Sequence, residues 1–253
     1  MMNIIKSIRK PILWFLLIEG GLYLLFLMGD LLGFSTDGLK YLAIALCAGL
    51  AVGRARRSRE WFVPAALLLT LAADACLLFG GPYLVGVVLF CGVQTLYAAR
   101  LMWWRGRVRQ FVWQDHMQSV AWRVFLYGVS LIALRALSEA GGTERGTPLN
   151  AAALRSFSQL TVSAVEAWHL KRFDPRVRTF AVGLSLFWAC DLCVGLRYVL
   201  MGSQAAWRPM IAYGIWFFYL PAQVCIALSD AVRADDSDPA APTVCSPARR
   251  NSS

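Results

Sequence analysis

Apolar runs of membrane-spanning length recur along this chain of 253 residues and dominate what it can fold into. A helix needs around twenty apolar residues to cross about 30 Å of hydrocarbon. Hydrophobic residues make up 58% of the chain, and the mean hydropathy of +0.54 lies far above that of a soluble globular protein. We predict an all-α polytopic membrane helical bundle with eight transmembrane helices, at approximately Ile12–Met28, Leu39–Gly53, Trp61–Phe79, Tyr83–Trp103, Val120–Leu137, Asn150–Leu170, Thr179–Leu200 and Met210–Ser229.

Positive charges follow the pattern expected of cytoplasmic loops, which collect Lys and Arg. With the N-terminus inside, the cytoplasmic segments hold 18 basic residues and the external segments hold three, namely Lys40, Arg145 and Arg208. Four further arginines fall near helix ends, where their side chains can extend to the interface: Arg123, Arg135, Arg155 and Arg197. Both termini are therefore predicted to be cytoplasmic. An anionic inner leaflet accounts for the net charge of +10, so no nucleic-acid partner is expected.

An aspartate interrupts the third apolar run. Asp74 stands in the sequence AADAC, and the next run carries Gln94 and Tyr97 on one face at i, i+3 spacing. A charged residue at the centre of an inserted helix costs roughly 2.5 kcal/mol or more, so it normally faces the protein interior and serves a function. The alternative is that Asp74 only holds helices together through hydrogen bonds.

The same arrangement occurs a second time near the C-terminus. Asp191 stands in ACDLC, in a run predicted to cross in the same direction and at a similar depth, and the last run carries Tyr219 and Gln223 at i, i+4. This similarity suggests two parallel four-helix repeats. If the repeats pack face to face, Asp74 and Asp191 approach one another. Two carboxyl groups in one dry site do not both ionise readily, so the pair offers an acid and a base together.

Other polar residues in the apolar runs have two interpretations each. Two polar stripes could line the same cavity, one formed by Glu19 and Tyr23 and the other by Gln159, Ser163 and Glu166. The second interpretation of Glu166, and the expected one, is that it pairs with Lys171 or Arg172 in the following loop. Arg197 either binds a lipid phosphate or extends to the membrane surface. The scattered cysteines and two isolated histidines predict neither disulfides nor a metal site.

The ends of the chain complete the domain organisation. The N-terminus has the basic front and apolar middle of a signal peptide but no small-x-small cleavage site, so we expect it to remain as the first helix. Residues 1–233 are predicted to form the transmembrane domain. Residues 234–253 are small, polar and proline-containing, and we expect them to form a disordered cytoplasmic tail.

Three stretches, GVVLFCGVQTLYAARL, LFWACDLCVGLRYVL and YLPAQVCIALS, resemble the blocks of the lysoplasmalogenase (YhhN-like) family of membrane proteins. The resemblance spans about Leu67 to Ser229. It singles out seven positions, Asp74, Phe90, Tyr97, Phe187, Asp191, Tyr219 and Gln223. Two positions depart from the family pattern, since Ala73 replaces a glycine and Gln94 replaces a histidine.

The resemblance implies a hydrolase that cleaves the vinyl ether of a lysoplasmalogen or related lysolipid to a fatty aldehyde and a glycerophospho-alcohol, with no cofactor. Asp74 and Asp191 would be catalytic, and Gln94, Tyr97, Tyr219 and Gln223 would bind the substrate. Arg197 is a further candidate for substrate binding because its charge could bind a lipid phosphate. The alternative is a non-catalytic lipid-binding or small-solute transport protein that kept the fold, because the family histidine is lost. The expected partner is a membrane lipid or lysolipid substrate, and the short loops and Arg- and Ala-rich composition suggest a bacterial inner membrane.

Overall fold

The computed structural model describes residues 2–58, 60–108, 113–141, 148–172, 175–199 and 208–229, and all regular structure within these ranges is helical. The predicted all-α class is confirmed, and each predicted segment overlaps one helix. The eight helices are α1 (Met2–Leu31), α2 (Asp37–Ser58), α3 (Phe62–Leu78), α4 (Tyr83–Val108), α5 (Trp113–Gly141), α6 (Pro148–Leu170), α7 (Pro175–Val199) and α8 (Arg208–Leu228). The proposed tail, 234–253, lies outside the described residues.

Six of these helices are long and apolar enough to cross a membrane: α1, α2, α4, α5, α7 and α8. A polytopic membrane protein is thus confirmed, while a count of eight spans remains a prediction. Helix α3 has 17 residues, which corresponds to a length of about 26 Å, slightly less than the hydrocarbon core. Helix α6 is long enough, but it carries a seam of serines, asparagine and glutamate and is not among the six.

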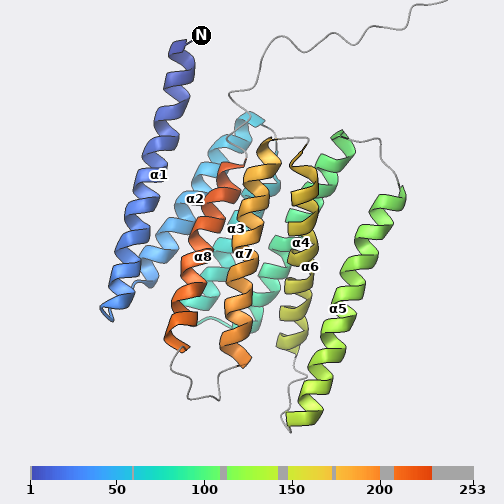
Figure 1. Cartoon of the computed structure of the whole chain (residues 1–253). Coiled ribbons are helices and arrows are strands. Elements are labelled where there is room, and N and C mark those ends of the chain that lie inside the picture. Colours follow the sequence, from blue (N-terminus) through green and yellow to red (C-terminus); the bar gives the residue numbers. More distant parts are fainter. Residues whose placement is uncertain are drawn as a thin grey trace, which may run out of the picture.

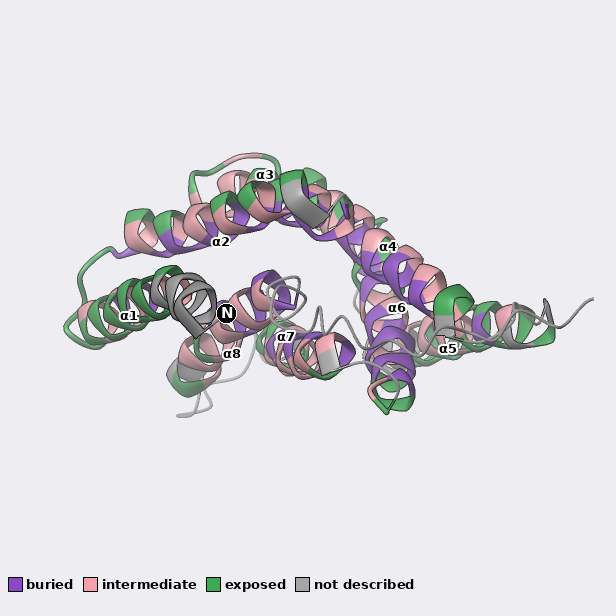
Figure 2. Ribbon diagram, turned by 90° about the horizontal axis from the view of Figure 1, so that it is seen from above, coloured by how far each residue is buried: buried purple, intermediate pink, exposed green. Residues whose placement is uncertain are grey.

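Two helical hairpins form the centre of the bundle. Consecutive helices alternate in direction and stand side by side (Figure 1). Helix α3 packs along α4, and α7 packs along α8. Viewed from above, α2, α3, α4 and α6 form an arc, and α7 and α8 lie on its inner side (Figure 2). Contacts of α8 with α2 and α3, and of α7 with α6, hold the second hairpin against that arc.

Helices α1 and α5 lie at the two ends of the arc and present most of their surface outward (Figure 2). Large apolar side chains are exposed on both, including Trp14 and Leu24 on α1 and Phe125 and Ile132 on α5. An outward-facing apolar surface of this kind is unfavourable in water and favourable in lipid. The hydrophobic core lies among α2, α3, α4, α6, α7 and α8, and Phe26 of α1 also belongs to it.

A glycine allows α7 and α8 to approach closely. A Cβ atom added at Gly183 would lie 2.7 Å from Cγ1 of Ile226 and 3.1 Å from the carbonyl oxygen of Ala222. Neither neighbour can move easily, because Ile226 is fully buried and Ala222 contributes backbone. Small residues at helix contacts are a general means of bringing membrane helices together.

We therefore predict that Gly183→Ala lowers stability in detergent by about 1–3 kcal/mol, the usual cost of overpacking. Thermal unfolding followed by circular dichroism measures the effect. Gly49→Ala on α2 is the matched control, because its added Cβ meets nothing within 4 Å and removal of a helical glycine is mildly stabilising. Equal melting temperatures for the two variants would contradict the close contact at Gly183.

Candidate functional site

The first carboxylate of the site, Asp74, lies near the end of α3 and is bound by a side chain from α8. The hydroxyl of Tyr219 lies 2.8 Å from Oδ2 and 3.0 Å from Oδ1 of Asp74. Both side chains are buried. A buried carboxylate needs hydrogen-bond donors to offset its lost hydration, and Tyr219 supplies one from the opposite hairpin.

The second carboxylate, Asp191, lies on α7 and is bound by a side chain from α4. The amide nitrogen Nε2 of Gln94 donates a hydrogen bond of 3.3 Å to Oδ2 of Asp191. Gln94 is buried and Asp191 half-buried. Gln94, which is expected to stand in place of a family histidine, is therefore in direct contact with a carboxylate.

In these two hydrogen bonds, each hairpin supplies the donor for the aspartate of the other hairpin. The aspartate of the α3–α4 hairpin is bound from α8, and the aspartate of the α7–α8 hairpin is bound from α4. Both carboxylates interact electrostatically with the thiol of Cys190, which places them around one buried side chain. Asp74 and Asp191 thus lie in the same part of the bundle, and a single site shared by the two carboxylates stays a prediction.

Aromatic rings close this region on the side of the second hairpin. The ring of Phe187 on α7 packs edge-on against the rings of Phe90, Tyr97 and Tyr219, with centroid separations of 5.9, 6.4 and 5.7 Å. Edge-to-face pairs of this kind fix ring orientation as well as burying apolar area. Five of the seven positions singled out by the family resemblance therefore pack together here or bind one another: Asp74, Phe90, Tyr97, Phe187 and Tyr219.

Tyr97 and Gln223, also predicted as binding residues, are fully buried. Arg197 differs, because its side chain is exposed on α7, six residues beyond Asp191. Six residues amount to about 9 Å along a helix and turn the side chain to another face. The structure therefore separates Arg197 from the two carboxylates and favours its extension toward the membrane surface.

A proline sets the position of Tyr219 and Gln223. Pro221 lies between them inside α8 and has no backbone N–H, so the carbonyl of Phe217, four residues earlier, loses its helical partner. The hydroxyl of Tyr23 on α1 donates to that carbonyl at 3.0 Å. Tyr23 therefore binds a free backbone group of α8, while Glu19 on the same helix accepts a 3.6 Å contact from the Cys47 thiol.

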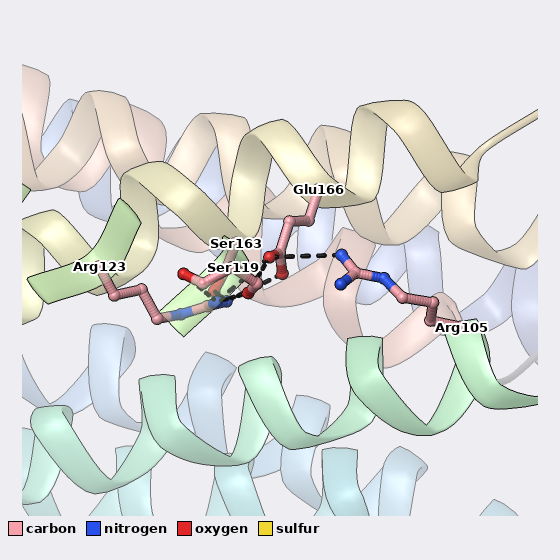
Figure 3. A network of polar contacts seen from close by, with 5 residues as sticks. All are labelled: Arg105, Ser119, Arg123, Ser163 and Glu166. Atoms are coloured by element: carbon pink, nitrogen blue, oxygen red, sulfur yellow. Dashed lines mark hydrogen bonds and ion pairs between the residues drawn. The ribbon is translucent and has the colours of Figure 1, made fainter. Parts of the chain in front are cut away.

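Glu166 lies in a separate polar cluster between α4, α5 and α6 (Figure 3). Its carboxylate pairs with Arg123 at 2.9 Å and with Arg105 at 3.3 Å, and it also accepts from the Ser119 hydroxyl. The predicted partners, Lys171 and Arg172, are wrong: the ammonium of Lys171 lies over the ring of Trp168, at 3.7 Å. Arg123 had been expected to extend to the membrane surface, but it points into the bundle because α6 offers this buried acid.

The expectation that no two cysteines are spaced as Cys-x-x-Cys is wrong for one pair near the carboxylates. Cys190 and Cys193 flank Asp191 as Cys-x-x-Cys, and both are free thiols in the structure. Cys190 is buried and belongs to the hydrophobic core. Thr70 was not predicted as a site residue, although it stands four residues before Asp74 on α3 and so shares its face of the helix.

The model of the YhhN family matches residues 35–229, which is more than three quarters of the chain. The chain belongs to the YhhN family. This match confirms the resemblance drawn from the sequence and covers α2 to α8, whereas α1 with Glu19 and Tyr23 lies outside it. Neither the curated proteins nor the solved structures give a match to the chain.

Substitutions at the acid and at the arginines of the Glu166 cluster should lower stability to different extents. Glu166→Gln should lower the melting temperature in detergent more than Arg123→Gln or Arg105→Gln, because it leaves two guanidinium groups facing each other without a carboxylate. Breaking a buried pair from one side costs about 3–5 kcal/mol, and either arginine variant still leaves one partner for the acid. If Arg123→Gln proved more damaging than Glu166→Gln, Glu166 would not be the centre of this cluster.

Proposed function

We propose that this YhhN-family protein is an intramembrane hydrolase that cleaves the vinyl-ether bond of a lysoplasmalogen or related lysolipid. The observation that supports it is the pair of aspartates, each bound by a side chain from the opposite hairpin, in a chain of this family. The site lies among membrane-length helices, where a lipid is the accessible substrate. Family membership suggests the reaction, and the two carboxyl groups provide suitable chemistry for it.

The reaction requires an acid, a carboxylate and water. A protonated carboxyl group transfers its proton to the vinyl carbon that does not bear oxygen, and the electrons of the double bond move to leave an oxocarbenium ion. The second, ionised carboxylate stabilises that cation and accepts a proton from the attacking water. The hemiacetal then collapses to a fatty aldehyde and the glycerophospho-alcohol, as the oxygen of the glycerol takes up a proton.

Asp74 and Asp191 are proposed for these two carboxyl roles. Tyr219 and Gln94 hold the carboxylates and orient them, because their hydrogen bonds come from helices that belong to the other hairpin. Phe90 and Phe187 surround the hydroxyl-bearing ring of Tyr219 and keep bulk water away from the cation. A dry surrounding strengthens the interaction between the carboxylate and the oxocarbenium ion.

A direct assay tests the proposal. Purified protein is incubated with a lysoplasmalogen and, in parallel, with an acyl lysolipid of the same headgroup, and the products are analysed for aldehyde and fatty acid. Aldehyde from the first lipid alone supports the vinyl-ether hydrolase. Release of neither product by folded protein would favour the lipid-binding or transport alternative, which the loss of the family histidine keeps open.

Asp74→Asn and Asp191→Asn should each lower turnover about 100-fold or more, because each removes a proton donor or acceptor while keeping the shape of the side chain. The double variant should be little slower than either single variant, since groups that act as a unit are not additive. Asp37→Asn, which changes a partly exposed carboxylate at the start of α2, is the control. Turnover near wild type in either single variant would exclude the carboxyl pair.

Gln94→His restores the family residue beside Asp191. An imidazole can both donate to the carboxylate and exchange a proton near neutral pH, whereas an amide cannot titrate there. We therefore expect higher turnover of the vinyl-ether lipid and an additional inflection in its pH profile. Gln118→His, an exposed position on α5, controls for the introduced ring. An unchanged rate and profile in folded Gln94→His protein would show that the missing histidine does not limit this chemistry.

A further inference from the structure

Three buried polar side chains lie one helical turn from the carboxylate site: Thr70 on α3, Tyr97 on α4 and Gln223 on α8. Each is fully buried. Four of their side-chain atoms have no hydrogen-bond partner: Oγ1 of Thr70, the hydroxyl of Tyr97, and both Nε2 and Oε1 of Gln223. Leaving a buried polar group unpaired costs about 1–3 kcal/mol, so such a concentration in one place points to a ligand.

The helix directions place these three residues at one level. Thr70 precedes Asp74 by four residues, Tyr97 follows Gln94 by three, and Gln223 follows Tyr219 by four. Helix α3 begins at the end of the bundle where α4 and α8 finish, so all three displacements point the same way (Figure 1). The result is a second polar layer, made of Thr70, Tyr97 and Gln223, about 5–6 Å from the carboxylates along the helix axes.

Contacts within the core agree with this placement. The hydroxyls of Thr70 and Tyr97 lie near one another, although outside hydrogen-bond geometry. Tyr97 also interacts electrostatically with Asp74 and with Tyr219, so the second polar layer is adjacent to the carboxylate site. Gln223 belongs to the turn of α8 that follows Tyr219 and Pro221, the turn whose position Tyr23 helps to set.

The side chains of the second polar layer indicate which kind of ligand group it can bind. Two hydroxyls and an amide are neutral, and together they offer donors and acceptors for a neutral hydroxyl group. A phosphate would require cations or several N–H donors. Arg100, the nearest cation along α4, already donates to Ser229 at 2.6 Å, lies 3.8 Å from the Glu60 carboxylate and stacks on the ring of Trp104.

We propose that the second polar layer binds the free sn-2 hydroxyl of a glycerol lysolipid and thereby selects lysolipids over lipids substituted at that position. This inference rests on the proposed function, which sets the vinyl ether beside the carboxylates. The glycerol carbon that carries the sn-2 hydroxyl is next to the carbon that carries the ether oxygen. A lipid reacting at Asp74 and Asp191 therefore brings its hydroxyl about one turn away, to the second polar layer.

Selectivity follows from the burial of these residues. A substituent on the sn-2 oxygen removes the donor and inserts bulk where the surrounding side chains are fully buried. The polar atoms of Thr70, Tyr97 and Gln223 then stay unpaired. Sites built to hydrogen-bond a hydroxyl reject analogues that lack it far more strongly than apolar pockets reject an extra methylene.

The test measures binding separately from turnover. Two 1-O-alkyl glycerophospholipids are used, one with a free sn-2 hydroxyl and one with a 2-O-methyl group. Neither carries a vinyl ether, so neither can be protonated to an oxocarbenium ion and hydrolysed. Their affinities are compared by titration calorimetry with the full chain in detergent. We expect wild-type protein to prefer the free hydroxyl by roughly 10-fold or more, as one to two lost hydrogen bonds imply.

Variants assign that preference to the second polar layer. Thr70→Val and Tyr97→Phe should reduce it severalfold toward equal affinity, while the melting temperature without lipid stays the same or rises, because each removes a buried hydroxyl that has no partner. Thr95→Val, whose hydroxyl bonds to the Cys91 carbonyl of its own helix, is the matched control and should keep the preference.

The outcomes separate this inference from the proposed function. Equal affinity of the wild-type protein for the two alkyl lipids, or binding of neither, overturns the second polar layer as a hydroxyl site, even if lysoplasmalogen is hydrolysed. The inference is also overturned if Thr70→Val and Tyr97→Phe lower the melting temperature but keep the preference, because the two hydroxyls would then have a structural role. If both variants abolish the preference for the free hydroxyl, the inference is supported, even if the wild-type protein forms no aldehyde. In that case only the hydrolase proposal fails.

Discussion

The placement of two carboxylates, Asp74 buried and Asp191 half-buried, among apolar helices is the constraint on which the rest of this structure depends. Neither aspartate is satisfied within its own hairpin: Asp74 needs the hydroxyl of Tyr219, and Asp191 needs the amide of Gln94. Separating the hairpins would leave both carboxylates in a dry interior without donors, at a cost of several kcal/mol for each charged group. The same hydrogen bonds therefore dock α3–α4 against α7–α8 and align the groups that we propose for catalysis.

Helix α8 is the element through which distant parts of the chain influence this site. Pro221 frees the Phe217 carbonyl, and Tyr23 on α1 binds it, so a helix at the edge of the bundle contributes to the placement of Tyr219 and Gln223. At the end of α8, Ser229 accepts from Arg100 of α4. The helix is thus held in its middle, next to Tyr219, and at its C-terminal end, on either side of the turn that carries Gln223. This arrangement suits a site that must orient a lipid without rigid loops.

Polar atoms in the interior fall into two groups with different consequences. In the cluster around Glu166, the carboxylate meets two arginines and a serine, and we assign that cluster to stability. In the second polar layer, the hydroxyls and the amide have no partner within the described part of the chain, and five of the ten unpartnered buried atoms belong to this layer or to Gln94. Satisfied groups stabilise the fold, whereas unsatisfied groups beside a reactive pair are available to a substrate.

The sequence by itself determined the helical class, the approximate position of each helix and the two aspartate-bearing segments, because membrane length, hydropathy and i, i+3 or i, i+4 spacing are local properties of the chain. Only the tertiary structure decided which side chains meet. Three features depend on how the helices pack. They are the hydrogen-bond donor that each hairpin supplies to the aspartate of the other, the pairing of Glu166 with Arg123 rather than with a loop lysine, and the alignment of Thr70 with Tyr97 and Gln223. Local spacing fixes the face that a side chain shares with its neighbours on one helix; the partner on another helix is set by the packing of the whole bundle.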